Sequence, residues 1–329
     1  MLPKPTRRLG LAAKLFQPSR IALVALNLLA YVLLFRWAAE NIQADRLADS
    51  FRVIPGWALL GALTINCLVL VMCGVRMSWL MNRDFRPSFS IINIGYALNT
   101  LLPLRLGEPI KIYVCHRLFK IPLTGIFAAS VAEKLFDLVL AIALVAAVLG
   151  LTAAQLIQLG TLISLCVLTL VALLAIFLFQ RYVVQIVKLL PKGSRLRRIS
   201  IELHKHARGY RIGRILAVSS CIWALNVFLV YFSFNTFTPD LHISMLEAAT
   251  LLIVMALAIA IPSAPAGLGL FEAGIVAYLT QKSGICNETA LAIASVFHLV
   301  ITLPQVLIAT KLLWGRKIMF LNSMAKIND

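Results

Sequence analysis

Long apolar segments alternate with short polar ones along most of the chain. Six of them, residues 21–39, 53–80, 122–150, 156–179, 215–237 and 289–313, are close to or above the length of about 20 mostly apolar residues that a membrane-spanning helix needs. The pattern therefore predicts an all-α, polytopic integral membrane protein with six full transmembrane helices, in a single membrane domain that covers residues 1–329. No A-x-A cleavage site follows the first segment, so we expect a retained helix there rather than a signal peptide.

Two further apolar stretches, 89–104 and 246–281, are interrupted by proline and glycine. Proline removes a backbone donor and clashes with the preceding helical turn, so neither stretch favours one continuous helix. We expect each stretch to form a re-entrant hairpin with a break in its middle. The residues at these breaks are Asn99, Pro103 and Gly107 in the first stretch and Pro265, Gly267 and Gly269 in the second.

The distribution of basic residues gives an orientation for this arrangement. If both broken stretches are re-entrant, 26 of the 31 Lys and Arg residues lie on one face, and the other face has only Arg36, Arg46, Arg52 and Lys282. The positive-inside rule places the basic face and both termini in the cytoplasm, in the inner (plasma) membrane of a bacterium. The basic loop 181–214 then lies against anionic lipid headgroups, and we expect no nucleic-acid partner.

The order of these features predicts an internal inverted repeat. Residues 53–150 form a span, a broken hairpin and a span, and residues 215–313 repeat that order with the opposite membrane orientation. The tripeptide Ala-Ser-Val at 129–131, which follows the first hairpin, recurs at 294–296 after the second. Inverted repeats with broken helices at corresponding positions are typical of transporters that bind substrate near the middle of the bilayer.

Charged residues inside the predicted spans are candidates for a functional site. Glu133 and Asp137 lie about 16 and 22 Å along a helix that starts at Pro122 and share one face of it, near the middle of the bilayer. Lys134 points away from that face and is free to pair with either hairpin. Ionisable side chains at such depth are costly and indicate function by default, although an ion-pair network that only joins helices would also account for them.

The two breaks carry the other candidates. Arg105, Glu108 and Lys111 accompany the first break, and Glu272 follows the second in an otherwise uncharged stretch. We expect His298 to form a hydrogen bond within the helix packing rather than a proton relay, and Asn66, Asn99 and Asn226 to join helices by hydrogen bonds. Arg76 lies near a helix end, where its side chain can extend to the membrane surface, and we expect no role for it. The six cysteines lack CxxC spacing, and we expect no metal site and no cofactor.

The motif N-x-x-L-P-x-R-x-G-E at 99–108, the motif E-K-x-x-D at 133–137 and the motif P-x-G-x-G-x-x-E at 265–272 occur together in this order. With them the chain resembles the lysylphosphatidylglycerol synthase transmembrane-region family, also called the flippase-like domain family. The resemblance implies a membrane domain that moves lipids between leaflets. With only 20 residues before the first span and 16 after the last, we expect a membrane domain without the synthase domain. Ala266 stands where the family more often has glycine.

Taken together, these patterns predict a transporter, not an enzyme, that flips a lipid or lipid-linked headgroup between leaflets. In this hypothesis Arg105, Lys111 and Lys134 contact phosphate, while the carboxylates Glu108, Glu133, Asp137 and Glu272 contact a cationic headgroup or carry coupling protons. A separate lipid-modifying enzyme is a possible partner. Two alternatives stay open, an intramembrane lipid-modifying enzyme and a non-transporting subunit of an envelope-assembly complex.

Overall fold

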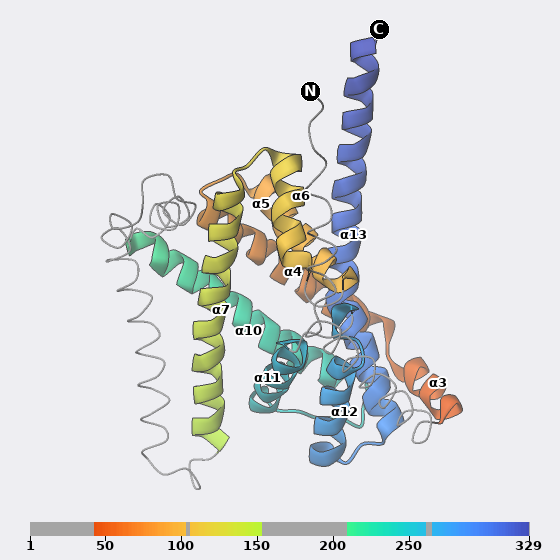
Figure 1. Cartoon of the computed structure of the whole chain (residues 1–329). Coiled ribbons are helices and arrows are strands. Elements are labelled where there is room, and N and C mark those ends of the chain that lie inside the picture. Colours follow the sequence, from red (N-terminus) through yellow and green to blue (C-terminus); the bar gives the residue numbers. More distant parts are fainter. Residues whose placement is uncertain (1–42, 103–105, 153–208, 261–264, 329) are drawn as a thin grey trace, which may run out of the picture.

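A computed structural model of the chain describes residues 43–102, 106–152, 209–260 and 265–328 (Figure 1). Within these ranges every regular element is helical, in agreement with the predicted all-α class. The predicted spans 21–39 and 156–179, and most of the loop 181–214, lie outside the described residues. The elements are α3 (Ala44–Val53), α4 (Gly56–Met81), α5 (Phe85–Leu101), α6 (Gly107–Phe119), α7 (Leu123–Thr152), α10 (Gly209–Thr236), α11 (Met245–Ala260), a 3-10 helix η2 (Pro265–Gly267), α12 (Leu270–Ser283) and α13 (Asn287–Asn328).

Four of these helices are long and apolar enough to cross a membrane. They are α4, α7, α10 and α13, and their apolar parts coincide with four of the six predicted spans. Large apolar side chains on their outer surfaces are exposed, for example Leu60 at 68% and Leu299 at 60%. In water such a surface would drive association, whereas the hydrocarbon core of a bilayer covers it without cost. The chain is therefore a multi-pass membrane protein.

Both predicted breaks interrupt helices. The first separates α5 from α6, and the second separates α11 from α12 and includes η2. In Figure 1 the pair α5 and α6 lies near one end of the bundle, and the pair α11 and α12 near the opposite end. Pro103 and Arg105 lie outside the described residues, and Gly107 begins α6.

Glycine is required where α6 starts. A Cβ atom at Gly107 would lie 2.3 Å from the backbone nitrogen of Asn99, so α5 and α6 approach at a distance that only glycine permits. At the second break the chain turns through Gly267 and Gly269, with φ of 75° and 84°. Ala266 also has a positive φ, 59°, in the left-handed region that L residues other than Asn and Asp rarely occupy.

The helices bury two apolar clusters. One cluster is formed mainly by α10 to α13 and includes Phe234, Phe271 and Phe297. The other is formed mainly by α4 to α7 and includes Met77, Ile91 and Phe136. The long helices α4 and α10 pack against each other, and each contributes residues to both clusters. The pair α4 and α10 therefore joins the two halves of the fold.

Candidate functional site

Six charged side chains form a continuous series of ion pairs in the half built from α4, α6 and α7. Arg76 of α4 contacts Asp137 at 2.6 Å and Glu133 at 3.1 Å. Lys134 contacts Glu133 at 3.9 Å and Glu108 at 3.7 Å, and Lys111 contacts Glu108 at 2.6 Å. We call this series the charge chain, and its members in order are Asp137, Arg76, Glu133, Lys134, Glu108 and Lys111.

Cations and carboxylates alternate along the charge chain, and this alternation stabilises it within an apolar protein. Its described members are three cations and three carboxylates, and each inner member has an opposite charge on both sides. Neutral donors support them, because Tyr96 Oη donates to Glu133 Oε1 and Asn99 Nδ2 donates to Glu108 Oε1. Trp223 of α10 donates to Asp137. An unpaired charge at these positions would carry a desolvation cost that the pairs offset.

The prediction that Arg76 has no role is wrong. Only 2% of its side chain is exposed, so it does not extend to the membrane surface. Its guanidinium group instead donates from one terminal nitrogen to Asp137 and Ser219, and from the other to Glu133 and Asp137. Two planar donor nitrogens suit a pair of carboxylates spaced one helical turn apart. The sequence includes both the arginine and the two carboxylates, but it does not predict that α4, which carries Arg76, packs against α7.

The carboxylates Glu133 and Asp137 share one face of α7, as predicted, and that face meets α4. Because both bind Arg76, the ion-pair alternative raised from the sequence accounts for Glu133, which is 1% exposed. Asp137 differs, since 28% of its side chain remains exposed. Lys134 contacts Glu133 and also pairs with the first hairpin through Glu108, which selects one of the two hairpins that the sequence allowed.

Glu272 lies apart from the charge chain. Its Oε2 accepts the backbone N–H of Gly269 at 2.6 Å, and its Oε1 lies 2.5 Å from His298 Nδ1. The first contact caps the first turn of α12, where a carboxylate also interacts favourably with the helix dipole. The second joins α12 to α13, which agrees with the expectation that His298 forms a hydrogen bond within the packing.

A cavity of about 480 Å³ lies between the two halves. Arg76, Glu108, Lys134 and Asp137 line one side, whereas Lys111 and Glu133 are 1% exposed and lie behind that wall. The lining residues of the second half, which we call the apolar wall, are mainly apolar and include Leu252, Met255, Ile259, Phe271, Phe297 and Ile301. Arg105 lies outside the described residues. A cavity with one charged and one apolar wall suits an amphipathic ligand.

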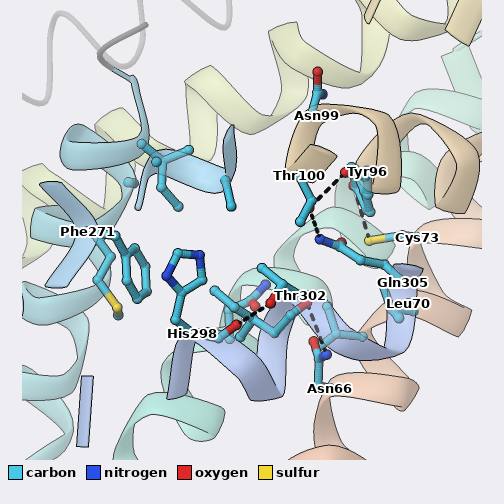
Figure 2. A pocket seen from close by; sticks show the side chains of 18 of the residues that line it. Asn66, Leu70, Cys73, Tyr96, Asn99, Thr100, Phe271, His298, Thr302 and Gln305 are labelled. Atoms are coloured by element: carbon cyan, nitrogen blue, oxygen red, sulfur yellow. Dashed lines mark hydrogen bonds between the residues drawn. The ribbon is translucent and has the colours of Figure 1, made fainter. Parts of the chain in front are cut away.

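Hydrogen bonds between helices fix the base of the cavity (Figure 2). Gln305 Nε2 of α13 donates to Thr100 Oγ1 of α5 at 2.7 Å, and Thr100 donates to the carbonyl of Tyr96. Figure 2 shows His298 beside Phe271 at the cavity, with their ring centroids 4.5 Å apart. These contacts tie α13 to both broken hairpins.

Asn66 has a specific role in this packing. Its Nδ2 donates to the carbonyl of Val300 at 2.8 Å, four residues before Pro304. Proline has no N–H, so Pro304 leaves that carbonyl without its usual helical donor, and Asn66 of α4 supplies one. The predicted role of Asn66 in joining helices is thereby confirmed. Asn226 differs, because it donates to the carbonyl of Ile222 in its own helix.

The fold and the site together define a multi-pass helical membrane protein with two broken helix pairs around an amphipathic, partly charged cavity. The sequence profile described as the lysylphosphatidylglycerol synthase transmembrane region matches residues 21–309. The chain therefore belongs to that family, as its three motifs indicate. No curated protein matches the chain in a direct sequence comparison.

Proposed function

We propose that this protein translocates a lipid or a lipid-linked headgroup between the leaflets of the membrane. The observation that carries the proposal is the cavity, to which the first half contributes charged side chains and the second half mainly apolar ones. A lipid has this same division between headgroup and acyl chains. The family to which the chain belongs also points to a membrane domain with a lipid-related function.

The packing of the two halves supports an inverted repeat. The repeat pairs α4 with α10, α5 with α11, α6 with α12 and α7 with α13. Contacts between the halves occur in equivalent pairs under this assignment. The contact of α5 with α13 corresponds to that of α11 with α7, and the contact of α4 with α13 corresponds to that of α10 with α7. A two-fold axis through the α4–α10 contact produces such an exchange. We infer that the axis lies in the membrane plane and that one repeat rocks against the other during transport.

The orientation proposed from the basic residues is compatible with this arrangement. The backbone N–H of Gln43, just before α3, donates to Glu288 at the start of α13. The segment with Arg46 and Arg52 therefore lies on the same side as the segment with Lys282, and the proposal assigns all three to the outer face. The proposal keeps both termini in the cytoplasm of a bacterial cell and anionic headgroups against the basic face.

Translocation is testable in vesicles that contain the full-length protein. Fluorescent phospholipid tracers are incorporated in both leaflets, and a membrane-impermeant reductant quenches those in the outer leaflet. If the protein translocates lipid, the quenched fraction exceeds that of protein-free vesicles. Lipid mass spectrometry on the same vesicles tests the alternative of a lipid-modifying enzyme, for which new products would appear. An envelope-assembly subunit would yield neither translocation nor products.

A matched pair of variants tests whether the cavity is the route. Ala256 lines the apolar wall, and Ala256→Trp places a large ring in the cavity. Ala217 lies on the exposed surface of α10, where tryptophan meets lipid or solvent. We expect Ala256→Trp to stop tracer movement and Ala217→Trp to preserve it. Full movement in Ala256→Trp would exclude this cavity as the route.

A further inference from the structure

The charges on the cavity wall balance among the described residues. Arg76 and Lys134 provide two cations, and Glu108 and Asp137 provide two carboxylates. Three of these four lining side chains are substantially exposed, Lys134 at 53% and each carboxylate at 28%. Arg76 is 2% exposed, and its terminal nitrogens are already bound to carboxylates. A ligand therefore meets one available ammonium group and two partly available carboxylates.

A headgroup with one net charge fits this wall poorly. An anionic headgroup would gain Lys134 but would also meet the carboxylates Glu108 and Asp137 in the same cavity. A headgroup with a net positive charge would bring more cations than the wall needs, because Glu108 and Asp137 already have Lys111 and Arg76 at 2.6 Å. Each would also leave an uncompensated charge in an environment of low dielectric constant, where the cost is large.

A zwitterionic headgroup keeps the wall neutral. Its phosphate can pair with Lys134, whose contacts with Glu108 and Glu133 are long, at 3.7 and 3.9 Å. Its ammonium group can share Asp137 or Glu108 without displacing the cation that each already has, because a carboxylate accepts several hydrogen bonds. The acyl chains then extend along the apolar wall of Leu252, Met255 and Ile259.

We propose that the cavity selects a phospholipid with a zwitterionic headgroup, whose phosphate binds Lys134 and whose ammonium group binds Asp137 or Glu108. This inference rests on the proposed function only in taking the cavity as a lipid site. Its test measures binding and not movement, so a failure of selectivity is distinguishable from a failure of translocation.

The test is a titration of the detergent-solubilised full-length protein, followed by native mass spectrometry. Three lipids with matched acyl chains are compared: zwitterionic phosphatidylethanolamine, anionic phosphatidylglycerol and cationic lysylphosphatidylglycerol. One charge-assisted hydrogen bond corresponds to about a tenfold change in Kd or more. We expect phosphatidylethanolamine to bind about tenfold more tightly than either charged lipid. Tighter binding of a charged lipid, or equal binding of all three, would overturn the proposal.

Two charge variants should shift the selectivity in opposite directions. Lys134→Gln leaves the wall with an excess negative charge, so we expect its preference to move about tenfold toward lysylphosphatidylglycerol. Asp137→Asn leaves an excess positive charge, and its preference should move toward phosphatidylglycerol. A merely structural role would weaken the binding of all three lipids equally.

Matched controls remove the same charges elsewhere. Lys282 is exposed at the end of α12, and Asp240 is exposed between α10 and α11. Neither lines the cavity, so Lys282→Gln and Asp240→Asn should keep the wild-type ratios. If the Asp137→Asn protein does not accumulate, the binding ratios of Lys134→Gln alone decide the test. The Lys134 side chain is half exposed, so the protein should tolerate the loss of its charge. Unchanged ratios in Lys134→Gln, or a shift toward phosphatidylglycerol, would contradict the proposal.

Discussion

The two halves of the protein place a glutamate at the same point of a similar break and surround it with different chemistry. Glu108 and Glu272 both lie in the first turn of the helix after the break. Glu108 contacts Lys134, four residues after Ser130, and Glu272 contacts His298, three residues after Ser295. Each glutamate thus joins its hairpin to the next long helix at an equivalent height, by an ammonium group in one half and an imidazole in the other.

The surroundings of these two pairs show what the difference means. The first pair belongs to the six-membered charge chain, and both of its members line the cavity, whereas in the second pair only His298 lines it, and the Glu272 and His298 side chains are only 11% and 5% exposed. Charged residues are expensive in an apolar fold, so the two further cations and two further carboxylates of the charge chain would not be needed merely to hold a hairpin. We infer that the first half recognises the ligand and that the second half supplies the apolar wall and a mechanical joint.

Removal of Arg76 should have the largest effect, because only the first half has a buried cation between two carboxylates. Arg76→Met removes the nearest cation of buried Glu133 and leaves it only the longer contact with Lys134, at 3.9 Å, and breaking a buried pair costs about 3 to 5 kcal/mol. We expect a matching loss of stability in SDS-induced unfolding. Arg52→Met is the control, since Arg52 pairs with Asp49 at the surface, where a pair contributes under about 1 kcal/mol.

A triple variant shows whether charge is the cause of that loss. Arg76→Met combined with Glu133→Gln and Asp137→Asn removes the unpaired carboxylates together with the cation. It should recover much of the stability, because no buried charge remains without a partner. If the triple variant is no more stable than Arg76→Met, then packing around Arg76, and not charge, would distinguish the first half.

The tight approach of α5 and α6 should also distinguish the halves. Gly107→Ala forces a Cβ to within 2.3 Å of the Asn99 backbone, and overpacking of this kind costs about 1 to 3 kcal/mol. In the second half, the Cβ of Gly274→Ala meets side chains alone, Val254 at 3.2 Å and Ala258 at 3.8 Å, so we expect a smaller loss. Tracer movement should fall in Gly107→Ala, because the hairpin can no longer close.

Gly213 provides the control for helix propensity. Apart from its own helix backbone, no atom of the described residues lies within 4 Å of a Cβ added there, so Gly213→Ala should stabilise α10 by roughly 0.5 to 1 kcal/mol. The same unfolding measurement compares all three glycine variants. Equal losses at Gly107 and Gly274 would contradict the difference that we infer between the two hairpins.

The sequence was sufficient for the apolar helices and for the position of both breaks, because each depends on local properties. Length and hydropathy located α4, α7, α10 and α13, and the missing donor of proline with the small size of glycine located the ends of α5 and α11. The side of α7 that carries Glu133 and Asp137 followed from helical periodicity.

Partner choice did not follow from the sequence, because it depends on which helices meet. Arg76 is five residues from the end of α4, a position from which its side chain could extend to the membrane surface. It does not, because α7 lies beside it and offers two carboxylates. The carbonyl freed by Pro304 was implied by the sequence, but its donor, Asn66, lies 234 residues away. Glu272 and Glu108 were expected at one cavity, whereas Glu272 is largely enclosed by α12 and α13.

The contact between Glu272 and His298 should be of moderate strength and should leave ligand choice unchanged. A double-mutant cycle with Glu272→Gln and His298→Gln should give a coupling energy of about 1 to 2 kcal/mol in SDS-induced unfolding, as for other buried charged hydrogen bonds. The ratios of lipid binding in Glu272→Gln should equal those of the wild type. A shift in lipid preference comparable to that of Asp137→Asn would mean that the second half also recognises the headgroup.

The smallest change in stability should come from a substitution in the backbone of the second break. It tests whether that break acts as a mechanical joint. Ala266 has a φ of 59° and a ψ of 0°, in a region that costs an L residue roughly 1 to 2 kcal/mol. Ala266→Gly removes this strain but gains chain entropy in the unfolded state, so we expect a net stabilisation of at most about 1 kcal/mol.

Ala217→Gly, within the regular helix α10, makes the same chemical change without strain and should instead destabilise by about 1 kcal/mol. The opposite signs isolate the backbone conformation as the cause. If the strain helps the joint to change conformation, Ala266→Gly should also slow tracer movement while it raises stability, because the broken state is then held more firmly. Unchanged movement would show that the strain at Ala266 is only a local cost of the turn, and a loss of stability would show that the left-handed conformation at this position does not persist in the membrane.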